Sequence, residues 1–172
     1  MKAIIIKCAV ALGLLSFSLP AFSQCDIHHR LYPDGSMFYF IEPVNFYWTK
    51  SKDLQGGIET DKENYYLELQ PSPFPEKPEG KKLKDDLDVK LANDSVYRLE
   101  HFDTRYLDND TTMQLLYLID KEKLKDFLNF DVVSVKMNLL DSAGIRTYVF
   151  KLHKSALREQ LSCFLNEKEK KE

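Results

Sequence analysis

Alternation of apolar and polar residues predicts β-strands along most of the chain. The first two predicted strands, 26–32 and 36–41, flank Pro33-Asp34-Gly35, a tripeptide typical of a tight turn because proline fixes φ and glycine tolerates positive φ. We therefore expect a hairpin at this point. Further strands are predicted at 44–50, 57–60 and 64–70.

The second half of the chain shows a cleaner two-residue period. Apolar residues alternate with polar ones on both sides of the turn Asn93-Asp94. The same alternation continues after that turn, as far as about residue 152. The predicted strands are 87–92, 97–99, 113–119, 133–139 and 145–152.

Two segments change from a strand period to a helical one. Residues 121–128 are predicted as a short crossover helix, with Asp120 as its N-cap. A C-terminal helix is predicted to begin at Ser155 and to fray after about Asn166, since its apolar residues form one stripe suited to packing on a sheet face. That stripe consists of Leu157, Leu161, Phe164 and Leu165.

These elements predict a mainly β fold, a β-rich α+β domain. We expect an antiparallel sandwich or a curved sheet, with one short crossover helix and a C-terminal helix packed on a sheet face. Residues 71–82, PSPFPEKPEGKK, hold four prolines, each of which removes a ladder donor, so this segment is predicted as an extended loop. It is also the one place where an inner domain boundary is conceivable.

The N-terminal residues resemble a signal peptide rather than part of the fold. Lys2 and Lys7 precede an apolar stretch, 9–19, and Ala21-Phe22-Ser23 provides small residues at the positions required before cleavage. We expect residues 1–23 to be removed, residues 24–166 to form a single domain, and 167–172 to be a charged tail. The mature protein would be exported, to the periplasm or outside the cell, with no transmembrane span after cleavage.

Cysteine usage fits an exported protein. Once the signal is removed, Cys25 and Cys163 form an even pair in a compartment that permits oxidation, so we expect a disulfide between the chain's N-terminal end and the C-terminal helix. Two alternatives stay open, namely a pair of free thiols and a lipid anchor on Cys25. Gln24 does not favour the lipid anchor, because lipoprotein processing resembles a pattern with a small residue directly before the cysteine.

Length and charge narrow the class of protein. The mature chain would keep 149 residues, the size of one domain. The signal contains two of the 24 basic residues and none of the 27 acidic ones, so 22 minus 27 gives a net charge of −5. This charge argues against general binding to nucleic acid and against adhesion to an anionic membrane surface.

No motif indicates a metal, a cofactor or a catalytic centre. His28 and His29 point to opposite faces of a strand, and the acids around Asp108-Asn109-Asp110 lack the pattern of a calcium loop, so we expect no metal site. His101 and Asp103 are predicted on one strand face without an assignable nucleophile, and Cys163 with His153 is similarly unsupported. We expect no cofactor, and a binding protein is favoured over an enzyme.

The segment 37–48, MFYFIEPVNFYW, is the candidate binding surface. It holds six aromatic rings in the eleven positions from Phe38 to Trp48, and strand alternation divides them between two faces. One set is expected in the core, and the other set, if exposed, would suit a sugar ring or a partner protein. The tentative ligand-binding residues are Tyr39, Tyr47 and Trp48.

Three classes of function follow from these observations. The first is an exported, non-catalytic module that binds a protein partner or assembles in the cell envelope. The second is a domain that binds a carbohydrate or an apolar ligand through exposed aromatics. The third is a small hydrolase, which would need a cleft that brings His101, His153 or scattered acids together.

Overall fold

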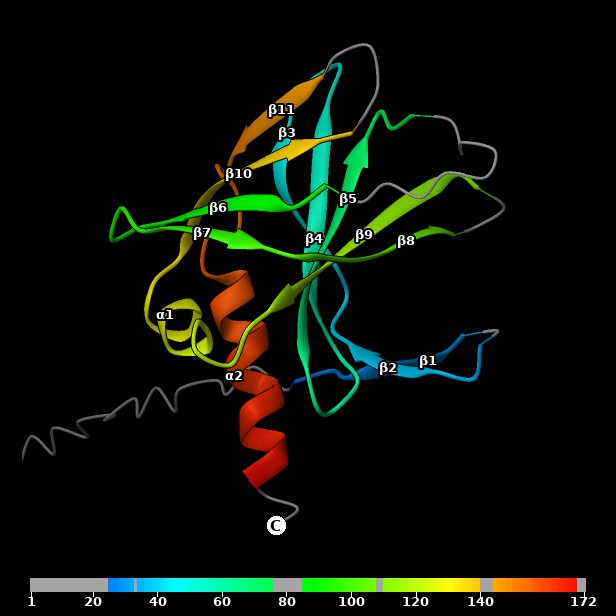
Figure 1. Ribbon diagram of the computed structural model, residues 1–172, viewed down its shortest axis with the longest axis vertical. Helices are drawn as coiled ribbons and strands as arrows, with labels where there is room; N and C mark the ends of the chain where they lie inside the picture. Colours follow the sequence, from blue (N-terminus) through cyan, green and yellow to red (C-terminus); the bar gives the residue numbers. More distant parts are fainter. Residues whose placement is uncertain (1–24, 33, 76–84, 108–109, 140–143, 170–172) are drawn as a thin grey trace, which may run out of the picture.

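The protein is described here by a computed structural model covering residues 25–32, 34–75, 85–107, 110–139 and 144–169 (Figure 1). The signal peptide predicted at 1–23 lies outside the described residues. So do 76–82 of the predicted loop, Asp108 and Asn109 of the rejected calcium loop, and 170–172 of the predicted tail.

The described residues form two antiparallel sheets, and the mainly β prediction is confirmed. The larger sheet has the order β1-β2-β4-β5-β9-β8, and β3 also pairs with β4. Its strands are β1 (His28–Leu31), β2 (Met37–Phe40), β3 (Val44–Trp48), β4 (Asp53–Thr60), β5 (Tyr65–Ser72), β8 (His101–Leu107) and β9 (Thr112–Ile119). The smaller sheet, in the order β11-β10-β6-β7, consists of β6 (Leu87–Leu91), β7 (Val96–Leu99), β10 (Val132–Asn138) and β11 (Ile145–Val149).

One apolar core spans the two sheets and both helices. The alternating residues Tyr65, Leu67 and Leu69 of β5 point into it and are nearly or fully buried. On β3, the ring of Phe46 stacks on that of Phe150, with ring centroids 4.2 Å apart. The backbone carbonyl of Phe46 also accepts a hydrogen bond from the N–H of Lys151 at 2.9 Å. Strand β3 of the larger sheet is thereby joined to the segment that follows β11 of the smaller one.

Two helices complete the described part of the fold (Figure 1). The short helix α1 (Leu124–Asn129) packs on α2 (Ala156–Glu169), and α2 also packs on β4, as predicted for a C-terminal helix on a sheet. A buried Gln160 on α2 accepts the backbone N–H of Ile58 at 2.8 Å. The prediction that Asp120 caps α1 is wrong, because the helix begins later, with Lys123 at the N-cap and no side-chain cap bond.

The larger sheet curls so strongly that its second face is also covered. The ring centroids of Phe38 on β2 and Phe102 on β8 are 6.4 Å apart, although three strands separate β2 from β8 in the sheet. In a flat sheet these strands would lie roughly 19 Å apart at about 4.8 Å per strand. We call this inner side of the curl the concave face. Its apolar cluster contains Tyr32, Phe38, Tyr66 and Leu116.

Two local predictions fail for identifiable reasons. Pro71 was expected in a loop but lies buried in β5, opposite Leu54 of β4. The missing proline N–H removes no hydrogen bond to β9, since the pairing of β5 with β9 has already ended at Leu69. His101 and Asp103 do not share a face, because a bulge in β8 shifts the register between them.

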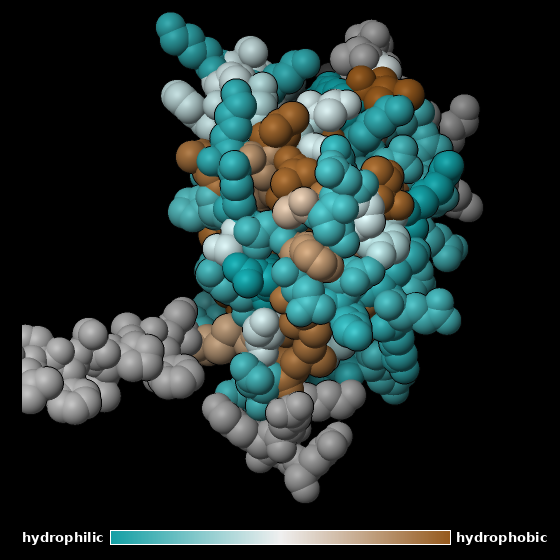
Figure 2. All heavy atoms as spheres, turned by 90° about the vertical axis from the view of Figure 1, so that its left-hand side faces the viewer, coloured by the Kyte–Doolittle hydropathy of each residue, from teal (hydrophilic) through white to brown (hydrophobic). Residues whose placement is uncertain are grey.

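The side of the molecule that carries the β6–β7 turn and α1 is mixed in character. Figure 2 shows apolar side chains there in separate groups, divided by hydrophilic ones. The cavities described below lie instead on the concave face of the larger sheet.

Candidate functional site

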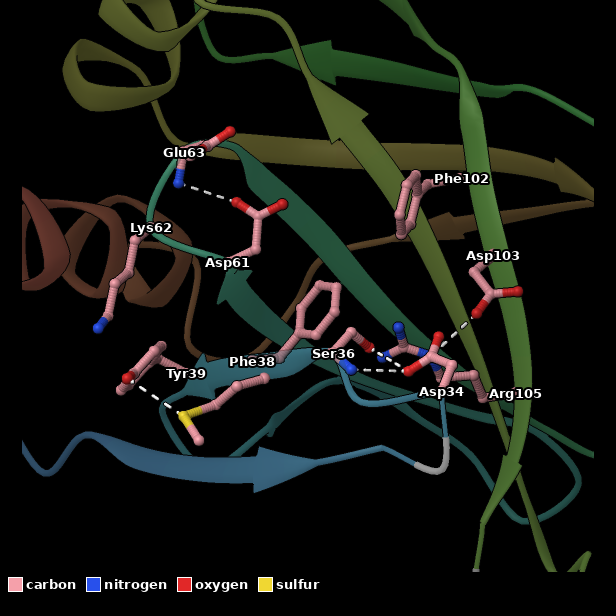
Figure 3. A pocket seen from close by; sticks show the side chains of 11 residues that line it. Asp34, Ser36, Phe38, Tyr39, Asp61, Lys62, Glu63, Phe102, Asp103 and Arg105 are labelled. Atoms are coloured by element: carbon pink, nitrogen blue, oxygen red, sulfur yellow. Dashed lines mark hydrogen bonds and ion pairs between the residues drawn. The ribbon is translucent and has the colours of Figure 1, made fainter.

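The concave face contains an open pocket between the β1–β2 hairpin and strand β8 (Figure 3). The pocket has a volume of about 640 Å³. Three chain segments build it: the turn and second strand of the hairpin, the β4–β5 turn, and the first part of β8. We call it the hairpin pocket. It is lined by Asp34, Ser36, Met37, Phe38, Tyr39, Asp61, Lys62, Glu63, Phe102, Asp103 and Arg105.

Aromatic rings form one part of this lining. Phe38 points from β2 toward the cavity and faces Phe102 on β8 (Figure 3). Phe38 is buried, whereas Phe102 is 49% exposed and rests on the ring of Tyr66, with centroids 4.5 Å apart. Tyr39 is half-buried, with the Lys62 ammonium 4.6 Å from its ring centroid. The pocket therefore offers ring faces and edges to a ligand.

Carboxylates form the other part of the lining. Hydrogen bonds from Ser36 lower the pKa of Asp34, which is fully exposed. Burial raises the pKa of Asp61, but hydrogen bonds from Asn64, Tyr66 and the backbone outweigh it and lower the pKa overall. Because a lowered pKa favours the ionised form, these two carboxyl groups are held as hydrogen-bond acceptors. With Glu63 and Asp103, the lining has four acids against the two cations Lys62 and Arg105.

Two further carboxyls lie deeper in the concave face. Glu59 on β4 and Glu68 on β5 are each 1% exposed. Glu59 pairs with Tyr66 and Glu68 pairs with Gly57, so the glutamates are diagonal neighbours on one face of adjacent strands. We call Glu59 and Glu68 the carboxyl pair.

The carboxyl pair is only partly satisfied by hydrogen bonds. One oxygen of Glu59, Oε1, accepts from Gln114 Nε2 at 2.9 Å, and Glu68 Oε1 accepts from Gln70 Nε2 at 2.5 Å. Glu59 Oε2 lies 3.5 Å from Arg105 Nη1, an ion pair without a hydrogen bond. Within the described residues, Glu68 Oε2 and Glu59 Oε2 are buried oxygens without a hydrogen-bond donor, which is costly unless something else satisfies them.

Burial changes the protonation of the pair. Loss of solvent, followed by the charge of Glu68, raises the pKa of Glu59 to about 8, and the nearby Arg105 guanidinium opposes this only in part. Burial likewise raises the pKa of Glu68. Because each charge disfavours the other, the pair retains a proton near neutral pH.

Arg105 connects the carboxyl pair to the hairpin pocket. Its Nε lies 3.0 Å from Asp103 Oδ2, and its guanidinium carbon stands 3.7 Å from the ring centroid of Tyr32 and 4.5 Å from that of Phe38. The hairpin is thus held against β8 by stacking of a cation on two aromatic rings.

The carboxyl pair lines a second, smaller pocket of about 200 Å³. We call it the carboxyl pocket. It shares no lining residue with the hairpin pocket. It is lined by Arg30, Phe40, Glu42, Pro43, Gln55, Glu59, Glu68, Gln70, Leu107 and Thr112.

The structure does not bring the three tentative ligand-binding residues together. Tyr39 pairs with Thr60 at one end of β4, while Trp48 pairs with Asp53 at the other, so they lie roughly 20 Å apart at about 3.3 Å per residue. Only Tyr39 lines the hairpin pocket. Tyr47 is half-buried against Tyr148, with ring centroids 5.5 Å apart, and Trp48 is 66% exposed.

The remaining predicted groups lie outside both pockets. Cys25 and Cys163 are at disulfide distance, with Cα atoms 5.8 Å apart. His101 Nε2 lies 2.8 Å from Thr104 Oγ1, and His153 is exposed. Among the described residues, no group of three or more histidine, cysteine, aspartate or glutamate side chains is arranged to hold a metal ion.

Sequence reasoning missed Glu59 and Glu68. Their positions alternate with Ile58, Leu67 and Leu69, a pattern that predicts both glutamates on the solvent-exposed face of a sheet. Nothing in this local pattern shows that the outer face is covered. The available signal is Gly56-Gly57 within a strand, which is typical of a close backbone approach.

Comparison of the chain with protein-family models, with curated proteins and with solved structures finds no match. Within the described residues, the helices are too short or too polar to cross a membrane. The function is therefore argued from the two pockets alone.

Proposed function

We propose that the protein is an exported, non-catalytic binding module that holds its ligand in the hairpin pocket. The observation that supports this proposal is the pocket itself, an open cavity of about 640 Å³ that combines ring faces with fixed hydrogen-bond acceptors. Ligand sites are typically concave, with apolar walls and a few placed polar groups. Phe102, which is 49% exposed at the rim, offers its ring to a ligand.

The ligand class that fits this lining is a saccharide. A sugar ring offers an apolar face for Phe38, Phe102 or Tyr39, and its hydroxyl groups donate hydrogen bonds to carboxylates such as Asp34 and Asp61. The acidic balance of the lining disfavours anionic sugars. Neutral or amino sugars are therefore the expected ligands.

Export to the periplasm or the outside of the cell belongs to the same proposal. The predicted signal sequence at 1–23 and the cysteine pair at disulfide distance support it, because disulfides persist in oxidising compartments. Lipidation of Cys25 competes with this pairing, since a lipidated thiol is not available to Cys163. Assembly with an envelope protein stays a prediction.

A glycan array probed with the mature chain, followed by NMR titration of the hits, tests the saccharide site. Phe102→Ala should weaken binding about fivefold, because stacking and apolar contact with a ring contribute on the order of 1 kcal/mol. Val149→Ala is the matched control, since Val149 is similarly exposed, at 52%, but lies on β11. Absence of saccharide binding, or equal binding by both variants, would overturn the proposal.

A small hydrolase is the second candidate, favoured by the carboxyl pair. A carboxyl with a raised pKa can donate a proton near neutral pH, and such groups gather at catalytic sites. Chromogenic glycosides and esters provide the test. Turnover that Glu59→Gln abolishes would favour the hydrolase. Absence of turnover at every pH between about 5 and 8 would rule out the hydrolase hypothesis.

A further inference from the structure

The carboxyl pocket holds two negative groups for which the fold supplies too few donors. Glu59 and Glu68 are almost completely buried, and each has one oxygen without a hydrogen-bond donor among the described residues. Both residues line the pocket, and Glu42 adds an exposed third carboxylate to its lining. When the pair is deprotonated, these buried oxygens need another partner in place of the proton that Glu59 and Glu68 otherwise share, either a water molecule or a ligand.

The two arginines near the pair have other partners. Arg105 is bound to Asp103 and stacks on Tyr32 and Phe38. The Arg30 guanidinium carbon stands 4.8 Å from the ring centroid of Phe40. Both arginines attract the pair electrostatically, but neither gives a hydrogen bond to the free oxygens.

Charged and titratable groups face the pair from several neighbouring segments. They comprise Arg30 on β1, Tyr32 after β1, Glu42 after β2, Tyr66 on β5, and Asp103 and Arg105 on β8. The neighbouring β9 contributes the neutral Gln114. If the exposed Glu42 is left aside, the two arginines balance Asp103 and one glutamate charge of the pair. The second glutamate is therefore neutral through a proton, or neutralised by a bound cation.

We propose that the carboxyl pocket binds a small organic cation with a primary ammonium group, held between Glu59 and Glu68. An ammonium carries three N–H donors, enough for both unsatisfied oxygens and for a third acceptor. The volume of about 200 Å³ is suited to a short alkylammonium or to the amino group of a larger molecule that extends past Glu42. Charge-assisted bonds of this kind are the stronger hydrogen bonds in proteins.

The shape of the donor set favours an ammonium over other cations. A metal ion would need more ligands, and the described residues provide no cluster of three or more. Guanidinium is a planar fork best matched to the two oxygens of one carboxylate, whereas the free oxygens here belong to two different side chains. A tetra-alkylated ammonium has no N–H donor at all.

Binding of an ammonium displaces the proton that the pair retains. The balanced step is protonated pair plus alkylammonium giving the deprotonated pair with bound alkylammonium plus one proton, which passes to the buffer. Affinity should therefore rise as the pH increases from about 6 to about 8, while the amine itself stays charged, as a lysine-like amine does below about pH 10. The inference is independent of the saccharide proposal, since the two pockets share no residue.

Isothermal titration of the mature protein with methylammonium chloride, in two buffers of different ionisation enthalpy, tests the inference. We expect saturable binding with release of up to one proton, stronger at about pH 8 than at about pH 6. Tetramethylammonium and guanidinium should bind at least about tenfold more weakly, because they lack or misplace the donors. Equal binding of all three cations, or no binding up to about 100 mM, would overturn the proposal.

Variants locate the site. Glu68→Gln keeps the shape of the side chain and removes one charge, so methylammonium affinity should fall at least about tenfold. Gln55→Lys, also in the lining, would place the protein's own ammonium in the pocket and should likewise block binding. Glu122→Gln, at an exposed glutamate before α1 and outside both pockets, is the control and should leave affinity unchanged. Circular dichroism confirms folding, and folded variants that all bind equally would contradict the assignment.

Discussion

Glu59 and Glu68 are the residues at which the fold departs most from simple burial of apolar groups. A buried carboxylate is destabilising unless it is paired and hydrogen-bonded, and here Gln114, Gln70 and Arg105 satisfy only part of the demand. Retention of a proton by the pair reduces the remaining free-energy cost of burying the two carboxyl groups. The same incomplete satisfaction makes the pair available to a ligand.

The pH dependence of stability should report this proton. A raised carboxyl pKa means that the folded chain binds a proton where the unfolded chain has lost it. The stabilisation is therefore fully present below about pH 4.5 and is lost as the pH rises through about 8. Urea denaturation should show stability falling by up to about 1.4 kcal/mol per pH unit within this window.

The double variant Glu59→Gln/Glu68→Gln provides the comparison for this slope. Neither amide titrates, so the slope between about pH 5 and 8 should flatten. An unchanged slope in the double variant would show that other groups cause the pH dependence.

Arg105 should contribute more to stability than an exposed arginine. Its side chain is 11% exposed, so Arg105→Ala would leave Asp103 without its buried ion pair and Glu59 with only Arg30 nearby, at a cost of about 3 to 5 kcal/mol. Arg98→Ala is the matched control, because its pair with Asp86 is largely exposed and should contribute less than about 1 kcal/mol. Similar losses in urea denaturation for the two variants would contradict this role for Arg105.

Strand β4 is the element on which the arrangement of the molecule depends most. It pairs with β5 along one edge and with both β2 and β3 along the other, and α2 packs on it. Such crowding leaves no space for side chains at Gly56 and Gly57. A Cβ on Gly56 would lie 2.3 Å from the carbonyl oxygen of Glu68, and one on Gly57 would lie 2.9 Å from Gln160 Oε1.

Alanine at the two glycines should therefore give unequal losses. Gly56→Ala forces the backbones of β4 and β5 apart and should cost at least about 2 to 3 kcal/mol. Gly57→Ala displaces only the end of the Gln160 side chain and its bond to Ile58, at a cost of about 1 kcal/mol. Thermal unfolding of both variants measures the difference, and an equal or reversed order would show that the close approach is misplaced.

At the scale of elements, the sequence predicts most strands but not their irregularities. Alternation locates β10 and β11 because one face of each is buried. It fails at the β8 bulge, where the register shifts between His101 and Asp103. It fails again at Pro71, which is tolerated because only one neighbouring strand pairs there. Both failures depend on pairing with a neighbour, which a local pattern does not contain.

At the scale of the whole molecule, the cysteine pair joins the two ends of the described fold. Cys25 precedes β1, and Cys163 lies on α2, 138 residues later. A bond across so long a loop constrains the unfolded chain strongly. We expect it to form in an oxidising compartment and to hold the start of the chain against the C-terminal helix.

Removal of this bond should destabilise the protein measurably. We expect the variant Cys25→Ser/Cys163→Ser to lose between about 2 and 5 kcal/mol of unfolding free energy in urea, as the loop length implies. Reductant should reproduce the loss in the wild type and leave the variant unchanged. Alkylation of both cysteines in the native, unreduced protein, detected by intact mass, would contradict the predicted bond.

The fold class could be predicted from the sequence, whereas the site could not. Period and turn residues specify a β-rich domain with a C-terminal helix, and they mark Tyr39 as one aromatic of the pocket. The curl that brings β2 to β8 is a property of the whole sheet, and it alone turns Glu59 and Glu68 from surface residues into buried ones. Trp48, the most conspicuous aromatic of the sequence, lies away from both pockets because it pairs with Asp53, at the end of β4 opposite to Tyr39.

The raised pKa of Glu59 implies that the carboxyl pair on the concave face keeps a proton near neutral pH. Carbon-13 NMR of the glutamate carboxyl groups across a pH titration tests it most directly. We expect a carboxyl resonance with a midpoint near 8 that disappears in Glu59→Gln. Titration of every glutamate at ordinary values near 4.3 would contradict it.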